Sequence, residues 1–301
     1  MAKLMLNFMS EALRRPVSLD IFVPGDHMVL RDGPLPEANK PYKTLYFLEG
    51  LMGNHSGPGN YSRIQGFAED YNLCVVVIGG ENKWYQDSRY SGDCFTKMIC
   101  QDVVNFTRRT LHLSQKREDT YIGGFSMGGH GAALLGLMHP EIFSKIVAIS
   151  GAFHRDVFME ATEELTWDLQ TKTNYQTLLG VEDMKDYPDS ENDYMTWAKR
   201  TASLAIRPEI FMCCGDQDDL LPIDEKFRQD MLTLGYNITW KVYEGAGHSY
   251  YTCDRGLEDS LQWMQLENFT ENYPYMTIKA DIGVHNLNNW HTWYNLEKEK
   301  A

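Results

Sequence analysis

Short apolar runs that alternate with helical segments constrain the fold of this chain more than any other feature. The run 73–78 (Leu-Cys-Val-Val-Val-Ile) is continuously apolar, and largely apolar runs also occupy 44–48, 146–150 and 210–214. Such runs are typical of strands in a sheet that is covered on both faces. Between them, apolar residues recur with helical spacing, as over 96–111. The alternation predicts an α/β fold with a mostly parallel sheet and helices on both faces.

The remaining elements follow from the same patterns. Alternating or apolar stretches predict strands at 17–23, 120–123 and 238–243. Helical spacing predicts helices at 61–71, 127–138, 227–234 and 257–264, and Gly235 and Pro140 act as stop signals.

The length of 301 residues would allow about two domains at roughly 150 residues each. The alternation instead continues through 1–269, so we predict a single domain there. Two segments depart from the pattern. Segment 154–205 is acidic and poor in strand signal, which predicts a cap-like insertion over one end of the sheet. Segment 270–301 is rich in aromatic and polar residues and is expected to be a C-terminal extension.

The strongest chemical signal is Gly124-Phe125-Ser126-Met127-Gly128, which fits the pattern G-x-S-x-G. A nucleophile on a sharp strand-to-helix turn needs neighbours without Cβ atoms two positions before and after it, and glycine meets that need. A predicted strand precedes the motif and a predicted helix of small residues follows it. This context favours a nucleophilic Ser126 over a glycine-rich turn without chemistry.

A serine nucleophile needs a general base and an acid that orients the base. His248 lies in a glycine-containing loop after the predicted strand 238–243, where open α/β sheets build their sites. His285 and His291 fall in the extension, and His130 falls on the predicted helix after the serine, where packing or capping is the better interpretation. We therefore predict that His248 is the base.

The acid is expected in the loop after the strand 210–214, which contains three aspartates, Asp216, Asp218 and Asp219. The chain order serine, acid, histidine is the order found in α/β-hydrolases. Asp218 is the preferred acid, followed by Asp219 and then Asp216, which falls where Gly-Asp commonly makes a turn.

Acyl transfer also needs two N–H donors aimed at the developing oxyanion. The main-chain N–H of Met127, directly after the nucleophile, is one candidate, and that of Leu51 in the glycine-containing loop 48–54 is the other. Trp84 and Tyr85 follow the strand 73–78 and are candidates for lining the substrate pocket. An interpretation as ordinary core or surface aromatics is equally favoured for these two.

With these residues assembled, the chain resembles the putative esterase family of α/β-hydrolases. This family includes tributyrin esterases, carbohydrate esterase family 1 and S-formylglutathione hydrolases, and the tributyrin esterase type is the most similar. The resemblance implies an α/β-hydrolase fold and hydrolysis of short acyl esters without a metal or organic cofactor. It also implies that the third residue after the strand-end Gly215 is the acid, which supports Asp218. The matching segments are 10–13, 50–55, 84–87, 116–120, 126–129, 150–152, 214–218 and 247–248.

Three positions depart from the family pattern. Glu49-Gly50 stands where the family usually has His-Gly, and we expect the Glu49 carboxylate to face away from the oxyanion. Ser249-Tyr250-Tyr251 stands where a tryptophan often follows the catalytic histidine, which affects the shape of the acyl pocket. The extension from about residue 270 continues beyond the usual family end.

The predicted function is therefore that of a serine carboxylesterase acting on short-chain acyl esters. A thioesterase of the S-formylglutathione type is the near alternative, although Met52-Gly53-Asn54 replaces the cysteine that this branch carries beside the oxyanion loop. A non-catalytic binding module on a hydrolase fold is a further alternative. The ordered serine, acid and histidine argue against it.

Charge and cysteine content limit the partners and the compartment. The 28 basic and 42 acidic residues give a net charge of −14, so we expect neither nucleic acid nor membrane as a partner and favour neutral esters. The six cysteines form no C-x-x-C pair and are expected to be reduced thiols. The N-terminal stretch is a poor signal peptide, which predicts a cytoplasmic location. A homo-oligomer is left open.

Overall fold

The computed structural model describes residues 2–25, 40–164 and 168–269. Its strands are β1 (Ala2–Ser10), β2 (Arg15–Val23), β3 (Lys43–Leu48), β4 (Leu73–Ile78), β5 (Thr120–Phe125), β6 (Lys145–Ile149), β7 (Glu209–Gly215) and β8 (Ile238–Tyr243). They form one sheet in the order β1-β2-β4-β3-β5-β6-β7-β8. Strands β3 to β8 run parallel to one another, whereas β1 pairs with β2, and β2 with β4, in antiparallel fashion. The predicted mostly parallel sheet is confirmed.

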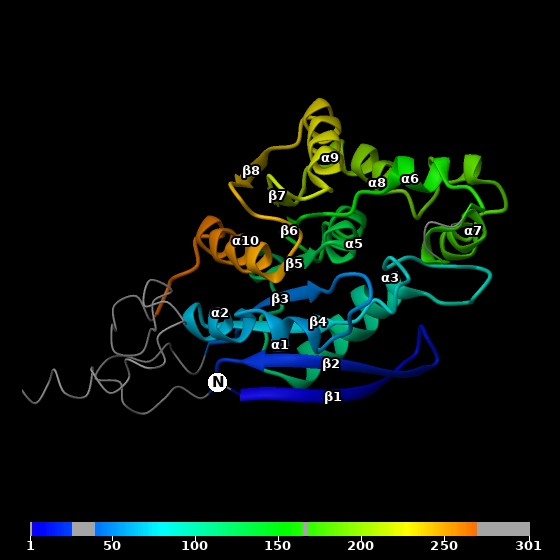
Figure 1. Cartoon of the computed structure of the whole chain (residues 1–301). Coiled ribbons are helices and arrows are strands. Elements are labelled where there is room, and N and C mark those ends of the chain that lie inside the picture. The colour runs from blue at the N-terminus through cyan, green and yellow to red at the C-terminus, as the bar shows by residue number, and fades with distance from the viewer. Residues whose placement is uncertain (1, 26–39, 165–167, 270–301) are drawn as a thin grey trace, which may run out of the picture.

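Helices cover both faces of this sheet (Figure 1). The α-helices are α1 (Gly57–Tyr61), α2 (Ile64–Asp70), α3 (Phe95–Lys97), α4 (Val104–Thr110), α5 (Met127–Met138), α6 (Arg155–Glu160), α7 (Lys172–Leu179), α8 (Tyr194–Ala202), α9 (Leu221–Thr233) and α10 (Tyr250–Trp263). The other helical segments are the π-helix η1 (Met98–Val103) and the 3₁₀ helices η2 (Arg117–Asp119), η3 (Asp168–Gln170) and η4 (Met184–Asp186).

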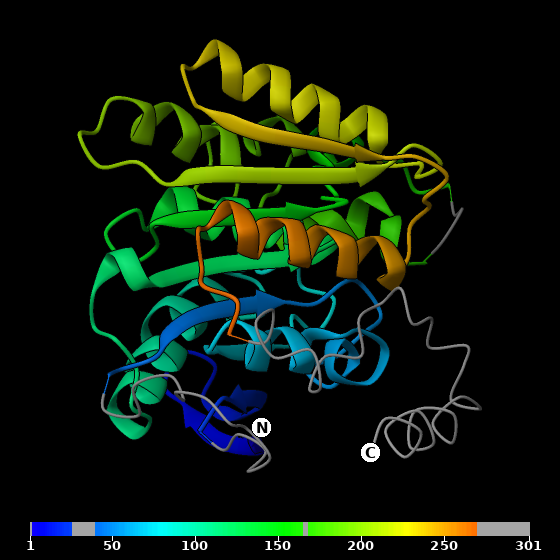
Figure 2. The ribbon, with the colours of Figure 1, turned by 90° about the vertical axis from the view of Figure 1, so that its left-hand side faces the viewer.

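Two apolar cores lie on the two faces of the sheet. One core packs α2 and α10 against the strands through Phe67, Leu257 and Leu261, and Figure 2 shows α10 crossing the front of the sheet. The other core joins α4, α5, α8 and α9 to the opposite face. The arrangement is the three-layer α/β-hydrolase fold that the sequence predicts.

The differences from the predicted elements have identifiable causes. The sequence patterns did not predict β1, because it is an edge strand in which Met5 is 81% exposed and the alternation is weak. The predicted helix 96–111 is observed as three consecutive segments, α3, the π-helix η1 and α4, which together span 95–110. Segment 154–205 holds α6, α7 and α8 and no strand among its described residues, whereas 270–301 lies outside the described residues. The single-domain boundaries stay a prediction.

The parallel strands bring their carboxyl ends to one edge of the sheet. In the register, Leu48 at the end of β3 lies beside Gly124 of β5, and Phe125 lies beside Ile149 of β6. Gly215 of β7 lies beside Tyr243 of β8. The loops that follow these ends are therefore neighbours in space, and they carry the predicted residues Ser126, Asp218 and His248.

Candidate active site

Ser126 occupies the sharp turn between β5 and α5. Its backbone has φ 59° and ψ −119°, a combination that costs a non-glycine residue about 1–3 kcal/mol. A Cβ atom on Gly124 would lie 2.3 Å from the Gly128 carbonyl oxygen, and one on Gly128 would lie 2.0 Å from the Leu48 carbonyl oxygen. Both glycines of the motif are thus required by close backbone contacts.

Hydrogen bonds from the next strand hold this strained turn in place. The Ser126 N–H donates to the Ile149 carbonyl at 2.9 Å, and the Ala152 N–H donates to the Ser126 carbonyl at 3.0 Å. Because both partners belong to β6 or the loop after it, the serine is fixed by the sheet itself.

The structure brings His248 between Ser126 and Asp218. His248 Nε2 lies 2.9 Å from Ser126 Oγ, and His248 Nδ1 lies 2.9 Å from Asp218 Oδ2. A carboxylate only accepts hydrogen bonds, so Nδ1 carries the proton and Nε2 is left to accept from the serine hydroxyl. The Phe125 ring stacks on the imidazole at 4.7 Å between centroids, which fixes its plane.

Of the three aspartates in the loop after β7, only Asp218 contacts the histidine. It is 4% exposed, and its Oδ1 accepts from the Leu220 N–H at 3.0 Å. Burial acts to raise the pKa of Asp218, but hydrogen bonds from His248 and the Leu220 N–H outweigh it and hold the pKa below its usual value. Asp216 and Asp219 are exposed, and Asp216 accepts from the Gly245 N–H.

The loop after β3 runs directly beside the nucleophile. A Cβ atom on Gly50 would lie 3.4 Å from Ser126 Cβ, and the Gly53 N–H donates to the Gly50 carbonyl to close a tight turn. Among the described residues, the N–H groups of Leu51 and Met127 donate to no protein acceptor. Met127 is the first residue of α5, where helix N–H groups lack intrahelical partners.

The two aromatic candidates for the substrate pocket are both buried. Tyr85 is fully buried and its hydroxyl donates to the Glu49 carbonyl at 2.8 Å, which favours a supporting role behind the loop over contact with substrate. Trp84 is 3% exposed and its ring packs 5.1 Å from His154 and 5.0 Å from Phe158. Its place in a substrate pocket stays a prediction.

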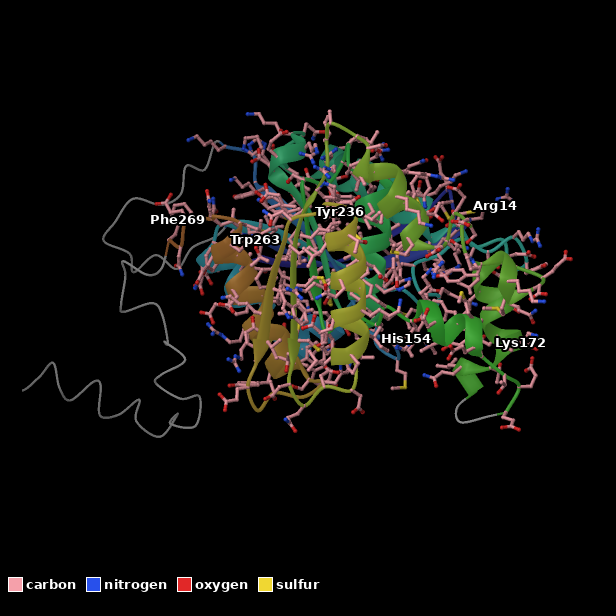
Figure 3. The ribbon with its side chains drawn as sticks, turned by 90° about the horizontal axis from the view of Figure 1, so that it is seen from above. Arg14, His154, Lys172, Tyr236, Trp263 and Phe269 are labelled. Carbon is pink, nitrogen blue, oxygen red and sulfur yellow. The ribbon has the colours of Figure 1, made fainter. Side chains whose placement is uncertain are left out.

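Two further histidines lie close to this edge of the sheet. His130 on α5 is completely buried, and burial lowers its pKa to about 3, so it is a neutral packing residue. His154, which follows β6, was not predicted as a site residue from the sequence. Burial, reinforced by the neighbouring His248, lowers its pKa to about 4. Figure 3 places it on the same side of the molecule as Lys172 of α7. The only sequence signal for His154 is its position soon after a strand end.

Metal-binding clusters, membrane-spanning helices and disulfides are all absent from the described residues. They contain no cluster of three or more His, Cys, Asp or Glu side chains arranged to hold a metal ion. Within the same residues, no helix has both the length and the apolar character needed to span a membrane. All six cysteines are free thiols, and five of them are buried. His285 and His291 lie outside the described residues.

Comparison with known proteins identifies the family. The family model described as putative esterase matches residues 10–271. The chain belongs to the putative esterase family. This confirms the resemblance, and the fold and the family together confirm the prediction of a carboxylic ester hydrolase.

Individual relatives agree with this placement of the esterase. It is 27% identical over 265 residues to an acetyl esterase of Caldicellulosiruptor saccharolyticus, covering 88% of this chain and 98% of that protein. It is 20% identical to an S-formylglutathione hydrolase of Paracoccus denitrificans, covering 84% and 89% of the two chains. Among solved structures, the fluorophosphonate-binding serine hydrolase F of Staphylococcus aureus has the same fold. Its TM-score is 0.74 at 24% identity, covering 87% of this chain and 98% of that one.

Proposed function

We propose that the esterase hydrolyses short-chain acyl esters through an acyl-enzyme formed on Ser126. The observation that carries this proposal is the continuous line of hydrogen bonds from Asp218 through His248 to the serine hydroxyl. The strained turn at Ser126 supports it, because such strain concentrates at functional sites.

In the proposed mechanism, His248 Nε2 takes the proton of Ser126 as the hydroxyl oxygen attacks the ester carbonyl carbon. Asp218 stabilises the imidazolium that forms, and the N–H groups of Leu51 and Met127 hold the oxyanion of the tetrahedral intermediate. The intermediate collapses as His248 donates its proton to the leaving alcohol. Water, activated by the same imidazole, then releases the carboxylic acid and regenerates the serine.

Two observations support a short acyl chain. An acetyl esterase is among the curated relatives. In addition, the rings of Trp84, His154 and Phe158 pack against one another, and His154 lies near His248; a proposed acyl pocket bounded by this cluster would be short. The net charge of −14 favours neutral esters over anionic ones.

The test compares p-nitrophenyl acetate with p-nitrophenyl butyrate on the wild type and on Ser126→Ala. We expect the substitution to lower kcat by roughly 10⁴-fold or more, since it removes the nucleophile. A Ser126→Ala protein that retains the wild-type rate would refute the mechanism.

Thioester hydrolysis is the second candidate, since an S-formylglutathione hydrolase is also among the relatives. The same preparation offered S-formylglutathione distinguishes the two, because a thioesterase would show the higher kcat/KM on the thioester. A cytoplasmic location is also a proposal, and fractionation of cells tests it. The oligomeric state is left open and can be measured on the purified protein.

A further inference from the structure

Glu49 is a buried carboxyl group directly beneath the loop beside Ser126. It follows the last residue of β3, immediately before the turn from Gly50 to Gly53, and it is 1% exposed. Its side chain folds back against this turn, since a Cβ atom on Gly53 would lie 1.9 Å from Glu49 Oε2. The carboxyl group therefore fills the space that the turn encloses and does not reach solvent.

The loop after β4 holds both this carboxyl group and the turn. The Gly80 N–H approaches Glu49 Oε1 at 3.5 Å, the Tyr85 hydroxyl donates to the Glu49 carbonyl at 2.8 Å, and Asn82 Oδ1 accepts from the Met52 N–H at 2.7 Å. Four non-glycine residues of this one loop have φ between 50° and 60°: Glu81, Asn82, Trp84 and Tyr85. Such strain, about 1–3 kcal/mol per residue, persists only where the surroundings enforce it, and it marks functional regions.

The surroundings of Glu49 favour its neutral form. Oε2 is buried and has no hydrogen-bond partner among the described residues. Within the part of the chain that the structure describes, the titratable groups that interact with its charge are Tyr85, from the loop after β4, and Tyr250, at the start of α10, and neither carries a positive charge. Burial raises the pKa of Glu49 to about 8, only partly opposed by the Gly80 N–H. The buried, unpaired oxygen and the raised pKa both favour the carboxylic acid form of Glu49 near neutral pH.

We propose that Glu49 is a positioning residue for the oxyanion hole, which supports the loop as a neutral acid and weakens oxyanion stabilisation when it ionises. The inference rests on the proposed function. Leu51, whose N–H is a proposed donor, lies two residues after Glu49 in the same tight turn. A negative charge enclosed by that turn repels the negative charge that develops on the substrate oxygen, and the burial of Glu49 limits screening of this repulsion by solvent.

The experiment compares the pH dependence of kcat for the wild type and Glu49→Gln between pH 6 and pH 10. Glutamine keeps the shape of the side chain and cannot ionise. For the wild type we expect kcat to fall roughly tenfold or more through a midpoint near pH 8, with little change in KM. For Glu49→Gln we expect a kcat within about threefold of the wild type at pH 7 and no fall through this midpoint. Ser126→Ala supplies the blank for spontaneous ester hydrolysis.

The matched control is Glu244→Gln, which removes an exposed carboxylate from the loop that carries His248. We expect this variant to keep the wild-type pH profile. An unchanged alkaline fall in Glu49→Gln, or an effect confined to KM, would overturn the inference. Activity that persists in Ser126→Ala would instead overturn the proposed function.

A second measurement does not depend on the folding of any variant. In wild-type protein labelled with ¹³C at the glutamate carboxyl carbons, one resonance should titrate with a midpoint near pH 8. If every glutamate resonance titrates in the ordinary range around pH 4–5, near the unperturbed pKa of about 4.3, the neutral acid does not exist and the inference is wrong.

Discussion

Replacement of Asp218 by asparagine tests the geometry of the site most sharply. One oxygen of Asp218 accepts from the Leu220 N–H and the other faces His248 Nδ1. An asparagine in this buried position has only one oxygen. If that oxygen keeps the Leu220 N–H, the amide NH₂ group faces Nδ1, and the imidazole proton must move to Nε2. His248 then donates toward Ser126 and can no longer accept its proton.

The magnitude follows from this change of tautomer. Loss of the correct tautomer in a serine triad costs roughly 10⁴-fold in kcat, equivalent to about 5.4 kcal/mol of transition-state stabilisation. Stability should change far less than activity, because asparagine preserves the shape of the side chain. The assay is kcat for p-nitrophenyl acetate at pH 7.5, accompanied by urea unfolding to confirm the fold.

Asp219→Asn is the matched control, because Asp219 lies in the same loop and is exposed. We expect its kcat to remain within about threefold of the wild type, as for a surface substitution away from the site. An Asp218→Asn enzyme that keeps a tenth or more of wild-type activity would refute the role of Asp218, and a large loss in Asp219→Asn would assign that role to Asp219.

Three further outcomes are expected from the structure. Gly128→Ala places a Cβ atom 2.0 Å from the carbonyl oxygen of Leu48, directly before the loop that carries Leu51, so kcat should fall about 10²-fold or more. Gly66→Ala is the control, because no atom lies within 4 Å of the added Cβ atom, and activity should be unchanged. Tyr85→Phe removes a buried hydroxyl and leaves its carbonyl partner unpaired, so urea unfolding should show a loss of about 1–3 kcal/mol. Burial lowers the pKa of His130 to about 3. The contribution of the neutral imidazole to the free energy of unfolding is therefore fully present above the unfolded-state pKa of about 6.5, and it is lost progressively as the pH falls toward 3. His130→Gln should reduce the pH slope of the unfolding free energy by up to about 1.4 kcal/mol per pH unit between pH 6 and 4, and an unchanged slope would contradict the assignment.

Much of the fold could be predicted from the sequence because buried parallel strands need apolar side chains at every position. The strand 73–78 and the helix 127–138 coincide with β4 and α5 for this reason. The edge strand β1 was not predictable in the same way. Its side chains are largely exposed, and it is ordered by main-chain pairing with β2, which no side-chain pattern records.

The candidate site was predictable where local geometry dictates the residue type. Gly124 and Gly128 are required by backbone contacts, so the pattern around Ser126 is visible in one short segment. The surroundings of Glu49 depend on a loop about thirty residues later in the chain, joined through Tyr85. The expectation that Glu49 faces away from the oxyanion did not include its burial inside the turn, because that follows from tertiary packing alone.

The attachment of segment 154–205 has a consequence for how this enzyme can diversify. The segment leaves the sheet after β6 and returns at β7, whereas the nucleophile, acid and base are fixed by the register of strand ends and by bonds between their loops. A change in the length or composition of the segment is therefore expected to leave that register intact. A library of variants restricted to this segment tests whether the range of accepted esters can change while Ser126, Asp218 and His248 keep their places.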